Sequence, residues 1–408
     1  MNLFFELSGY EFKKILCRKR TIIAVTLVIL ISALSVFGTI IGSYYYTDEN
    51  GNEITVSRYE DEMIDRKNAE ALSGRVIDAD LIMEAVESYR QVPLNSSMHY
   101  ADTAEYLNTA RKYSEIYNVV RRAYGLDGIE EFQAITREQA EQFDQKRREN
   151  REYVIENSDI SDNMRAYWQK CLDKYPETLT YEYSDGYDRF VTIMYTTAIM
   201  AGAVIAIMFS GIFSEEYTSG ADSLILSSRH GRGLVIGAKL FAAFVISAAL
   251  IILLTAISFA EAAAVWGAGG ADGALELLGD IFPYPITIGN AALIYSLCIF
   301  AAVLFFTAIT ALLSALFKAP FNAIVIMAII LVVPMMVSLP GEAPLWAVCI
   351  QNLIPTNMMA VWVTFGYEQY EIFGLVIPPY VFLPIFAFAA SAVCAFFAYK
   401  AFRKHQVS

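Results

Sequence analysis

Residues 234–266 read LVIGAKLFAAFVISAALIILLTAISFAEAAAVW, and only Lys239 and Glu261 in this stretch carry a charge. A helix needs about 20 mainly apolar residues to cross the roughly 30 Å hydrocarbon core of a bilayer. This stretch is long enough to tilt or to project beyond that core. The sequence therefore predicts a membrane-spanning helix here, and similar runs lie on either side of it.

Five further apolar runs qualify by the same length criterion. They cover residues 21–46, 190–213, 290–317, 319–339 and 378–402. The whole chain is 56% hydrophobic and 18% charged, whereas a soluble domain carries about 25% charged residues. The run at 319–339 contains Pro334, which a membrane helix tolerates when a neighbour satisfies the carbonyl that the proline frees. We therefore expect an all-α polytopic membrane protein with six transmembrane helices.

The basic residues set the expected orientation, because Lys and Arg near the ends of spans favour the cytoplasmic side. They flank alternate ends of the runs: Lys13, Lys14, Arg18, Lys19, Arg20, Arg229, Arg232, Lys239, Lys318, Lys400, Arg403 and Lys404. The loops at 267–289 and 340–377 contain no Lys or Arg. Six spans place every basic flank on one side, so both termini are predicted to be cytoplasmic, with residues 403–408 as a short tail.

The first 20 residues are predicted to form a cytoplasmic amphipathic helix. Leu3, Leu7 and Tyr10 recur at helical spacing and could form an apolar stripe on the membrane surface. The alternative is that this segment is only the frayed start of the first span. We favour the surface helix.

Residues 47–190 differ from the rest in charge. They hold 31 of the 43 acidic and 18 of the 30 basic residues, so this block accounts for the net charge of −13. It is long enough to fold alone, and residues 57–73, 80–90, 102–124 and 136–157 have helical composition. We expect a mainly helical extracytoplasmic domain at 47–189, between the first two spans. Its recurring tyrosines are expected to pack rather than to bind a ligand: Tyr100, Tyr106, Tyr113, Tyr117 and Tyr124.

Catalytic motifs are missing from the sequence. There is no Gly-x-x-x-x-Gly-Lys-Ser/Thr phosphate loop, no His-Glu-x-x-His pair and no Gly-x-Ser-x-Gly elbow. The five cysteines and three histidines are scattered, which argues against a metal site. Ionisable groups, which ion-coupled transporters keep at mid-membrane, are almost absent from the spans. We expect no catalytic residue, cofactor or metal in this chain, and therefore a partner that supplies energy.

The segment between the second and third spans is where such a partner could bind. Residues 213–239 read FSEEYTSGADSLILSSRHGRGLVIGAK, with an acidic start, an apolar centre and a basic end. A short helix of this kind suits docking into a groove of another protein. The alternative is a loop whose charges only anchor two membrane helices. Spacing alone leaves both open.

The same segment resembles the corresponding loop in permease subunits of type 2 (ABC-2) ATP-binding-cassette transporters. The matching positions are Glu215 or Glu216, Gly220, Leu224–Ser227, Arg232 and Lys239. The order of six spans and the amphipathic N-terminal segment are also similar to that family. The chain departs from it at Gly220-Ala221 and Arg229, where members often have Gly-Thr and a proline.

The resemblance implies that residues 214–233 act as a coupling helix on a separate ABC ATPase. The implied coupling residues are Glu215, Glu216, Gly220, Leu224, Leu226, Arg229, Arg232 and Lys239. It further implies two ATPase copies that bind ATP and Mg²⁺, a second permease of the same or a related chain, and no nucleic acid. The expected location is a bacterial plasma membrane.

The stretch at 340–377 resembles the family's re-entrant outer segment. Its candidate re-entrant or translocation-path residues are Gln351, Asn352, Pro355 and Asn357. Peptides, lipids, drugs and ions remain possible substrates. Two other functions stay open: an ABC-linked mechanotransmission protein, whose relatives usually have four spans, and a membrane sensor whose outer domain binds a peptide.

Overall fold

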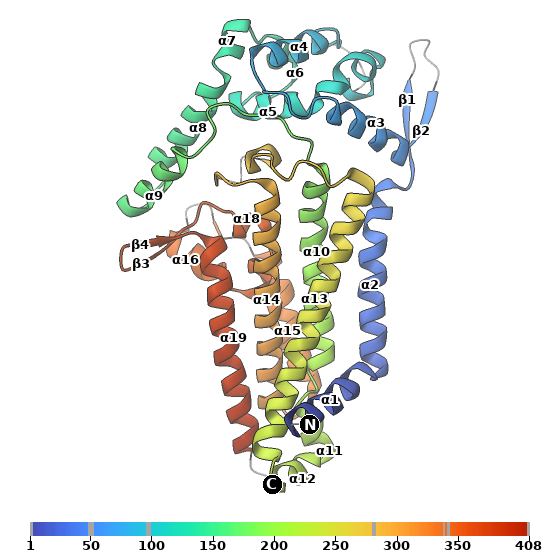
Figure 1. Cartoon of the computed structure of the whole chain (residues 1–408), viewed down its shortest axis with the longest axis vertical. Coiled ribbons are helices and arrows are strands. Elements are labelled where there is room, and N and C mark those ends of the chain that lie inside the picture. The colour runs from blue at the N-terminus through green and yellow to red at the C-terminus, as the bar shows by residue number, and fades with distance from the viewer. Residues whose placement is uncertain are drawn as a thin grey trace.

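The computed structural model describes residues 3–47, 53–94, 99–279, 283–337, 339–340 and 343–405. Long helices form a bundle, and a smaller helical domain covers one end of it (Figure 1). Helix α1 and the end of α19 lie at the opposite end (Figure 1). The strands within the described ranges form two short two-stranded sheets, so the mainly helical fold is confirmed.

Five helices of the described residues are long and apolar enough to cross a membrane. They are α2 (Lys19–Ile40), α10 (Asp185–Phe209), α13 (Ile236–Trp266), α14 (Ile288–Leu316) and α19 (Pro379–Lys404). Lipid offers no hydrogen-bond partners for the backbone. The peptide groups of these helices are therefore satisfied by hydrogen bonds within each helix. Small side chains such as Ala201, Ala243 and Ala302 are buried between them, which lets the helices approach closely.

The sixth apolar helix, α15 (Pro320–Met336), is shorter. Its 17 residues extend over roughly 25 Å at the usual helical rise, which is less than the typical hydrocarbon thickness. The break from α14 lies where expected: Ala319 is extended because it precedes Pro320, and the proline occupies the first turn of α15. The count of six membrane crossings therefore stays a prediction.

The first span ends earlier than predicted. Helix α2 stops at Ile40, and Gly42 has φ +116°, a backbone conformation that favours glycine. Tyr44 to Tyr46 then lie in β1 (Ser43–Thr47), which pairs antiparallel with β2 (Glu53–Ser57). The prediction that residues 41–46 continue the helix was wrong, because aromatic residues also suit a strand.

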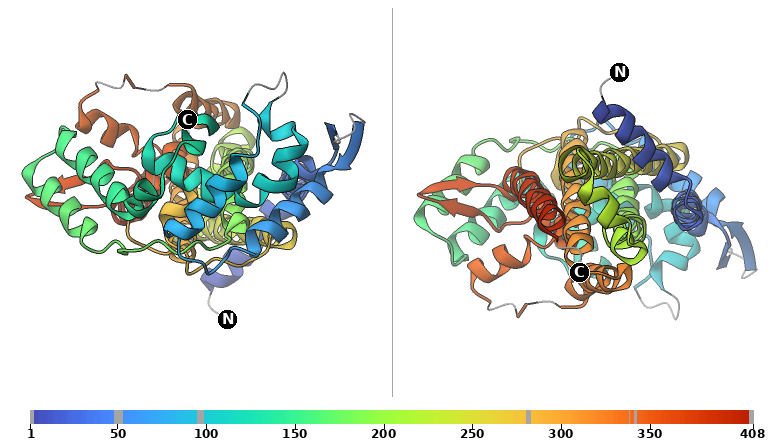
Figure 2. Two further views of the ribbon diagram at one scale, coloured as in Figure 1. Left: turned by 90° about the horizontal axis from the view of Figure 1, so that it is seen from above. Right: turned by 90° about the horizontal axis from the view of Figure 1, so that it is seen from below.

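Helix α1 (Leu3–Leu16) is separate from α2, since Arg18 is extended between them. Phe4 and Phe12 pack against Phe241 of α13, with ring centroids 5.6 Å and 6.3 Å away. Seen from below, α1 lies across the end of the bundle (Figure 2). It is therefore not the frayed start of α2, and its place on a membrane surface stays a prediction.

The domain between α2 and α10 has its own hydrophobic core. Its main helices are α3 (Arg58–Glu70), α4 (Ala79–Tyr89), α5 (Ser114–Tyr124), α6 (Ile129–Gln133), α7 (Arg137–Glu141), α8 (Phe143–Asn157) and α9 (Asp162–Leu172). Tyr117 stacks on Tyr89, and Phe132 meets both rings edge-on, with all three centroid distances at 5.0 Å. The other predicted tyrosines also contact this core, so the stripe is a packing surface.

The predicted helix at 102–124 is broken into shorter pieces. A 3₁₀ turn at Tyr100–Asp102 is followed by a π turn at Tyr106–Ala110, a second 3₁₀ turn at Arg111–Tyr113, and then α5. Arg111 is buried, and it pairs with Asp61 at 2.8 Å and Asp65 at 2.6 Å on α3. Residue composition predicts helices, but it cannot predict ion pairs between segments that lie far apart in the chain.

The segment between α15 and α19 is short and irregular. It contains α16 (Leu345–Gln351), α17 (Pro355–Met358), α18 (Val361–Thr364) and the hairpin of β3 (Tyr370–Ile372) and β4 (Leu375–Ile377). Figure 1 places these elements beside the upper half of the bundle. Residue 338 of the predicted fifth span, 341–342 of this segment and 406–408 of the predicted tail lie outside the described residues.

Candidate functional site

The segment predicted as the coupling loop folds as a helical turn at the lower end of the bundle (Figure 1). It consists of α11 (Ser214–Ser219), α12 (Ala221–Ser227) and the π turn η4 (Gly231–Val235), which leads into α13. Gly220 separates α11 from α12 at φ +70°, and glycine reaches this left-handed conformation without the strain that a Cβ imposes. The glycine therefore allows the sharp change of direction.

Glu216 and Lys239 form a buried ion pair across this turn. The Glu216 Oε1 to Lys239 Nζ distance is 2.7 Å, and the Lys239 side chain is 1% exposed. Two residues of α1 complete the cluster: Lys14 Nζ lies 2.5 Å from Glu216, and Glu11 lies 3.1 Å from Lys239. Burying these charges is tolerable because each has an opposite charge beside it. The cluster joins α1, α11 and α13.

Glu215 makes a second set of ion pairs with the start of α2. Arg18 lies 2.9 Å from its carboxylate, and Arg20 pairs with the other oxygen. These side chains are more exposed than the Glu216–Lys239 pair, so solvent screens them more strongly. Together the adjacent glutamates connect the turn to α1, α2 and α13.

The electrostatics on α1 and at its junction with α2 reflect these contacts. Burial alone would lower the pKa of Lys14, but its hydrogen bond to Glu216 and the nearby negative charges raise the pKa above its ordinary value. Burial lowers the pKa of Arg18, and the charge of Glu215 offsets this only in part. Lys14 is therefore held in its charged form.

The outward side of the turn is different in character. Leu224 is 75% exposed, while Leu226 is buried, and its carbonyl accepts a 2.8 Å hydrogen bond from Arg232 Nε. Arg229 is exposed. The outward side of the turn therefore carries an exposed leucine and the exposed arginines Arg229 and Arg232.

The end of α19 also contacts the turn. His405 Nε2 lies 3.4 Å from the buried carboxylate of Asp222, and the Tyr217 ring lies 4.2 Å from the imidazole. This contact is an ion pair only when His405 is protonated. The C-terminal end of α19 is thus in contact with the segment that was predicted to couple.

The predicted coupling residues fall into distinct groups. Glu216, Leu226 and Lys239 are buried, Glu215 is half-buried and paired, and Gly220 shapes the backbone. Leu224, Arg229 and Arg232 are exposed. Glu11 and Asp222 were not predicted from the sequence, and Lys14, Arg18 and Arg20 were interpreted only as topology signals.

Gly231 offers a sharp test of this geometry. An added Cβ would lie 1.6 Å from the Ile225 carbonyl oxygen, so we expect Gly231→Ala to displace α12 and to speed tryptic cleavage after Arg229. Gly233→Ala is the matched control, because its Cβ would meet nothing closer than the Tyr399 hydroxyl at 3.8 Å. Equal cleavage rates in the two variants, assayed in the same membranes, would contradict the close packing.

The predicted re-entrant residues hold together the segment between α15 and α19. Gln351 donates to the Val337 carbonyl at 2.7 Å, and Asn357 donates to the Gln351 carbonyl at 2.9 Å. Asn352 and Pro355 are buried, with the proline at the first position of α17. Their contacts are internal to the protein, so this geometry alone gives no reason to place them on a translocation path.

Thr356, which the sequence analysis missed, makes the most specific contact of this segment. Pro334 has no N–H, so it leaves the carbonyl of Ile330, four residues earlier in α15, without its helical partner. The Thr356 hydroxyl donates to that oxygen at 2.7 Å. This is the neighbouring group that the sequence analysis required for a proline inside a membrane helix.

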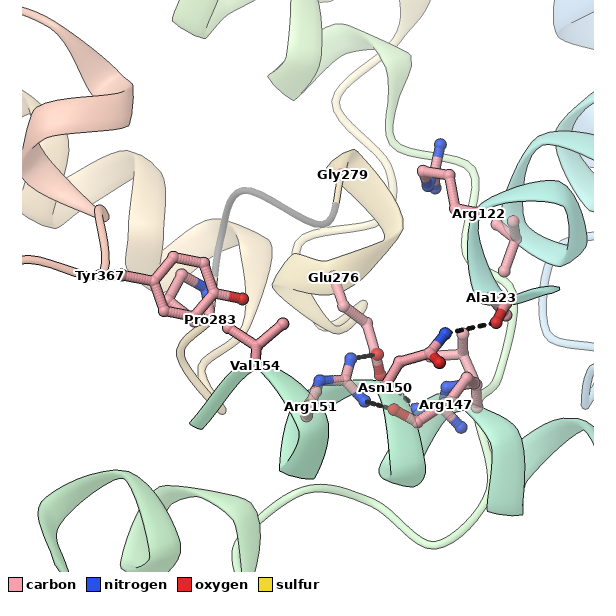
Figure 3. Close-up of a pocket in the computed structure, with 12 residues that line it drawn as sticks. Arg122, Ala123, Arg147, Asn150, Arg151, Val154, Glu276, Gly279, Pro283 and Tyr367 are labelled. Atoms are coloured by element: carbon pink, nitrogen blue, oxygen red, sulfur yellow. Dashed lines mark hydrogen bonds and ion pairs between the residues drawn. The ribbon is translucent and has the colours of Figure 1, made fainter. Parts of the chain in front are cut away.

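The domain between α2 and α10, which was predicted to lie outside the membrane and is called the outer domain below, is attached to the bundle by a buried charge cluster (Figure 3). Glu276, in the loop between α13 and α14, pairs with Arg147 at 2.5 Å and also with Arg151, both on α8. Asp144 pairs with Arg147 as well, and the Tyr175 ring lies 4.0 Å from the Arg151 guanidinium. A cavity of about 160 Å³ lies beside the cluster. The sequence predicted the helix at 136–157 and the loop at 267–289, but not the contact between them.

Comparison with known families places the chain. The family described as "ABC-2 family transporter protein" matches residues 6–359, which include the outer domain, the α11–α12 turn and α13 to α15. Comparison with curated proteins and with solved structures found no match. Because the family match covers most of the chain, this membrane protein belongs to the ABC-2 family of transporter proteins.

Proposed function

We propose that this chain is the permease subunit of an ATP-driven exporter and is coupled to a separate ATPase through residues 214–239. The observation that carries the proposal is the two-sided character of the α11–α12 turn. Its outward side presents Leu224, and its inward side is joined to three other helices through Glu215 and Glu216. A surface that binds a moving partner needs both properties.

The buried charges provide a route for transmission. A displacement of α11 moves the carboxylate of Glu216, and the pair with Lys239 carries that displacement into α13. The Glu215 pairs act in the same way on α2. Discrete packed contacts of this kind can convert a small shift at one site into a rigid-body movement of helices.

The rest of the proposed assembly is taken from the resemblance to ABC-2 permeases and from membership of that family. Two ATPase subunits bind ATP and Mg²⁺, and this chain works with a second permease, either a copy of itself or a related chain, in a bacterial plasma membrane. The six apolar helices cross the bilayer with both termini in the cytoplasm. ATP binding closes the ATPase pair and shifts the permeases between access states.

The exposed leucine gives the direct test. Leu224→Ser removes the apolar centre of the docking surface without touching the core, so we expect the permease to fold normally while recovery of the ATPase partner falls at least tenfold. Such a loss corresponds to about 1.4 kcal/mol, within the range for an aliphatic anchor at an interface. Co-purification of the native complex from membranes measures it.

A matched control is available at the other end of the molecule. Ile54, on strand β2, is also an exposed aliphatic residue, and Ile54→Ser should leave ATPase recovery unchanged. Full recovery of the ATPase with Leu224→Ser would remove the docking surface from the proposal. If no nucleotide-binding subunit is recovered even with the unaltered chain, the exporter proposal fails.

The second candidate function is mechanotransmission, in which ATP moves the outer domain and nothing crosses the membrane. The Glu276 cluster favours it, because a rigid attachment would carry movements of the bundle into α8. The two candidates differ in a measurable way. An exporter accumulates substrate outside proteoliposomes in an ATP-dependent manner, whereas a mechanotransmitter changes only the outer domain.

A further inference from the structure

The upper ends of α10, α13 and α14 border a groove of about 810 Å³. This volume is within the range of pockets that bind small ligands. Most of its lining is apolar and aromatic, including Phe190, Ile252, Phe259, Leu293, Leu297 and Phe300. The groove lies below the outer domain, on helices that we expect to cross the bilayer.

The groove opens toward the surroundings of the bundle. Ile252 and Leu293 line it and are 60% and 73% exposed. On apolar helices with no soluble domain beside this part, such exposure faces lipid. A ligand can therefore enter sideways from the membrane without passing through water.

The upper end of the groove is polar. Asp272, Thr287 and Asn290 line it there, and Asp272 is the one charged residue among the described residues that line the groove. The Asp272 carboxylate is exposed, and no ion pair to it occurs within the described ranges. A second cavity of about 200 Å³ shares Asp272 and Thr287 with the groove, and Lys174 and Glu276 also line it.

We propose that this groove binds an amphiphile that has an alkyl body and a cationic headgroup. The alkyl body would lie against the apolar walls, where van der Waals packing along the groove favours it over the surrounding lipid. The headgroup would lie at Asp272, near the level where the bilayer meets water, and the carboxylate would attract a cation there. Whether this ligand is also the cargo rests on the proposed export function.

The shape of the groove argues against a helix from a second copy of this chain as its occupant. Helices pack closely in membranes through small residues, whereas the exposed side chains that line the groove are bulky: Ile252, Leu293 and Leu297. A helix pressed over the groove would also bury Asp272 without a partner, which is costly. A flexible alkyl chain meets neither obstacle.

Photolabelling of the full-length permease in nanodiscs tests the site. The probe is an alkyltrimethylammonium amphiphile with a photoreactive group in its chain, and the comparison probe is the alkyl sulfate of equal length. We expect the cationic probe to label residues 251–259 and 287–300, as mapped by mass spectrometry. Asp272→Asn should reduce labelling about fivefold, the ratio expected for an ion pair of about 1 kcal/mol near a surface.

Two further variants serve as controls for the labelling experiment. Leu293→Trp fills the groove from a lipid-facing position, so it should reduce labelling while Asp272 stays intact. Asp127→Asn, at an exposed carboxylate of the outer domain, should leave labelling unchanged. Equal labelling by the two probes, or labelling that Asp272→Asn leaves unchanged, would overturn the cationic site. Cross-links between two chains at position 293 would identify a dimer interface instead.

The permease is labelled without its ATPase, so this result does not depend on coupling. In proteoliposomes with the ATPase, ATP-driven release of the cationic probe would support it as cargo. Specific labelling without release would overturn the role as cargo and keep the binding site. Absence of labelling would overturn the site even if the chain exports another compound.

Discussion

Glu216→Gln is expected to destabilise the permease by about 3 kcal/mol and to abolish coupling to the ATPase. The substitution removes the charge that lies 2.7 Å from Lys239, and that lysine is almost fully buried. Breaking a buried ion pair from one side costs about 3–5 kcal/mol, since it leaves the other charge without its partner. The low end applies because Glu11 remains near Lys239. A lower melting temperature in nanodiscs and loss of permease-dependent ATP hydrolysis would show it.

Glu215→Gln is the matched control, one residue away. Its partners Arg18 and Arg20 are more accessible to solvent than Lys239, so we expect a loss below about 1 kcal/mol. The two variants change the same chemical group by the same amount. Equal melting temperatures for both would mean that burial of the Glu216 pair does not matter, and unimpaired ATP hydrolysis with Glu216→Gln would remove it from the transmission route.

Glu276→Gln is expected to loosen the outer domain from the bundle. Arg147 and Arg151 both pair with this carboxylate, and the Arg147 side chain is only 6% exposed. Loss of the shared acceptor should cost about 3 kcal/mol, although Asp144 still neutralises Arg147. We expect faster amide hydrogen exchange in α8 and α9 with little change in α13, because local opening reports local stability.

Glu149→Gln on the same helix separates this effect from a general loss of charge. Glu149 makes an exposed pair with Lys146 at 3.7 Å, so its removal should change exchange in α8 by less than about 1 kcal/mol. If Glu276→Gln leaves exchange in α8 and α9 as it was, the outer domain is held by other contacts. Faster exchange throughout α13 would instead indicate that the bundle itself depends on Glu276.

The long apolar helices could be predicted because each apolar run carries its own signal. Residues 234–266 needed no tertiary information, and α13 ends at Trp266 as expected. The ends of the helices were harder to predict where the residue composition suits either a helix or a strand. Tyr44 to Tyr46 lie in a strand rather than in α2. Helix α15 ends at Met336, before the end of the predicted span 319–339.

The candidate site was predictable only in part, for a physical reason. The resemblance selected Glu215, Glu216 and Lys239 from their positions in one segment, and the structure brings Glu216 and Lys239 together. Their partners on α1 and α2 lie about 200 residues earlier in the chain, and no periodicity links such distant positions. The Arg147–Glu276 pair was missed for the same reason.

The Thr356 hydroxyl limits how the outer segment can move during a transport cycle. If α17 swung away from α15, the Ile330 carbonyl would lose its donor beside Pro334, inside an apolar helix. An unsatisfied carbonyl in hydrocarbon costs several kcal/mol, so α17 and the upper half of α15 should travel as one rigid unit. Any gate at this side of the membrane must then hinge elsewhere, at the ends of that unit.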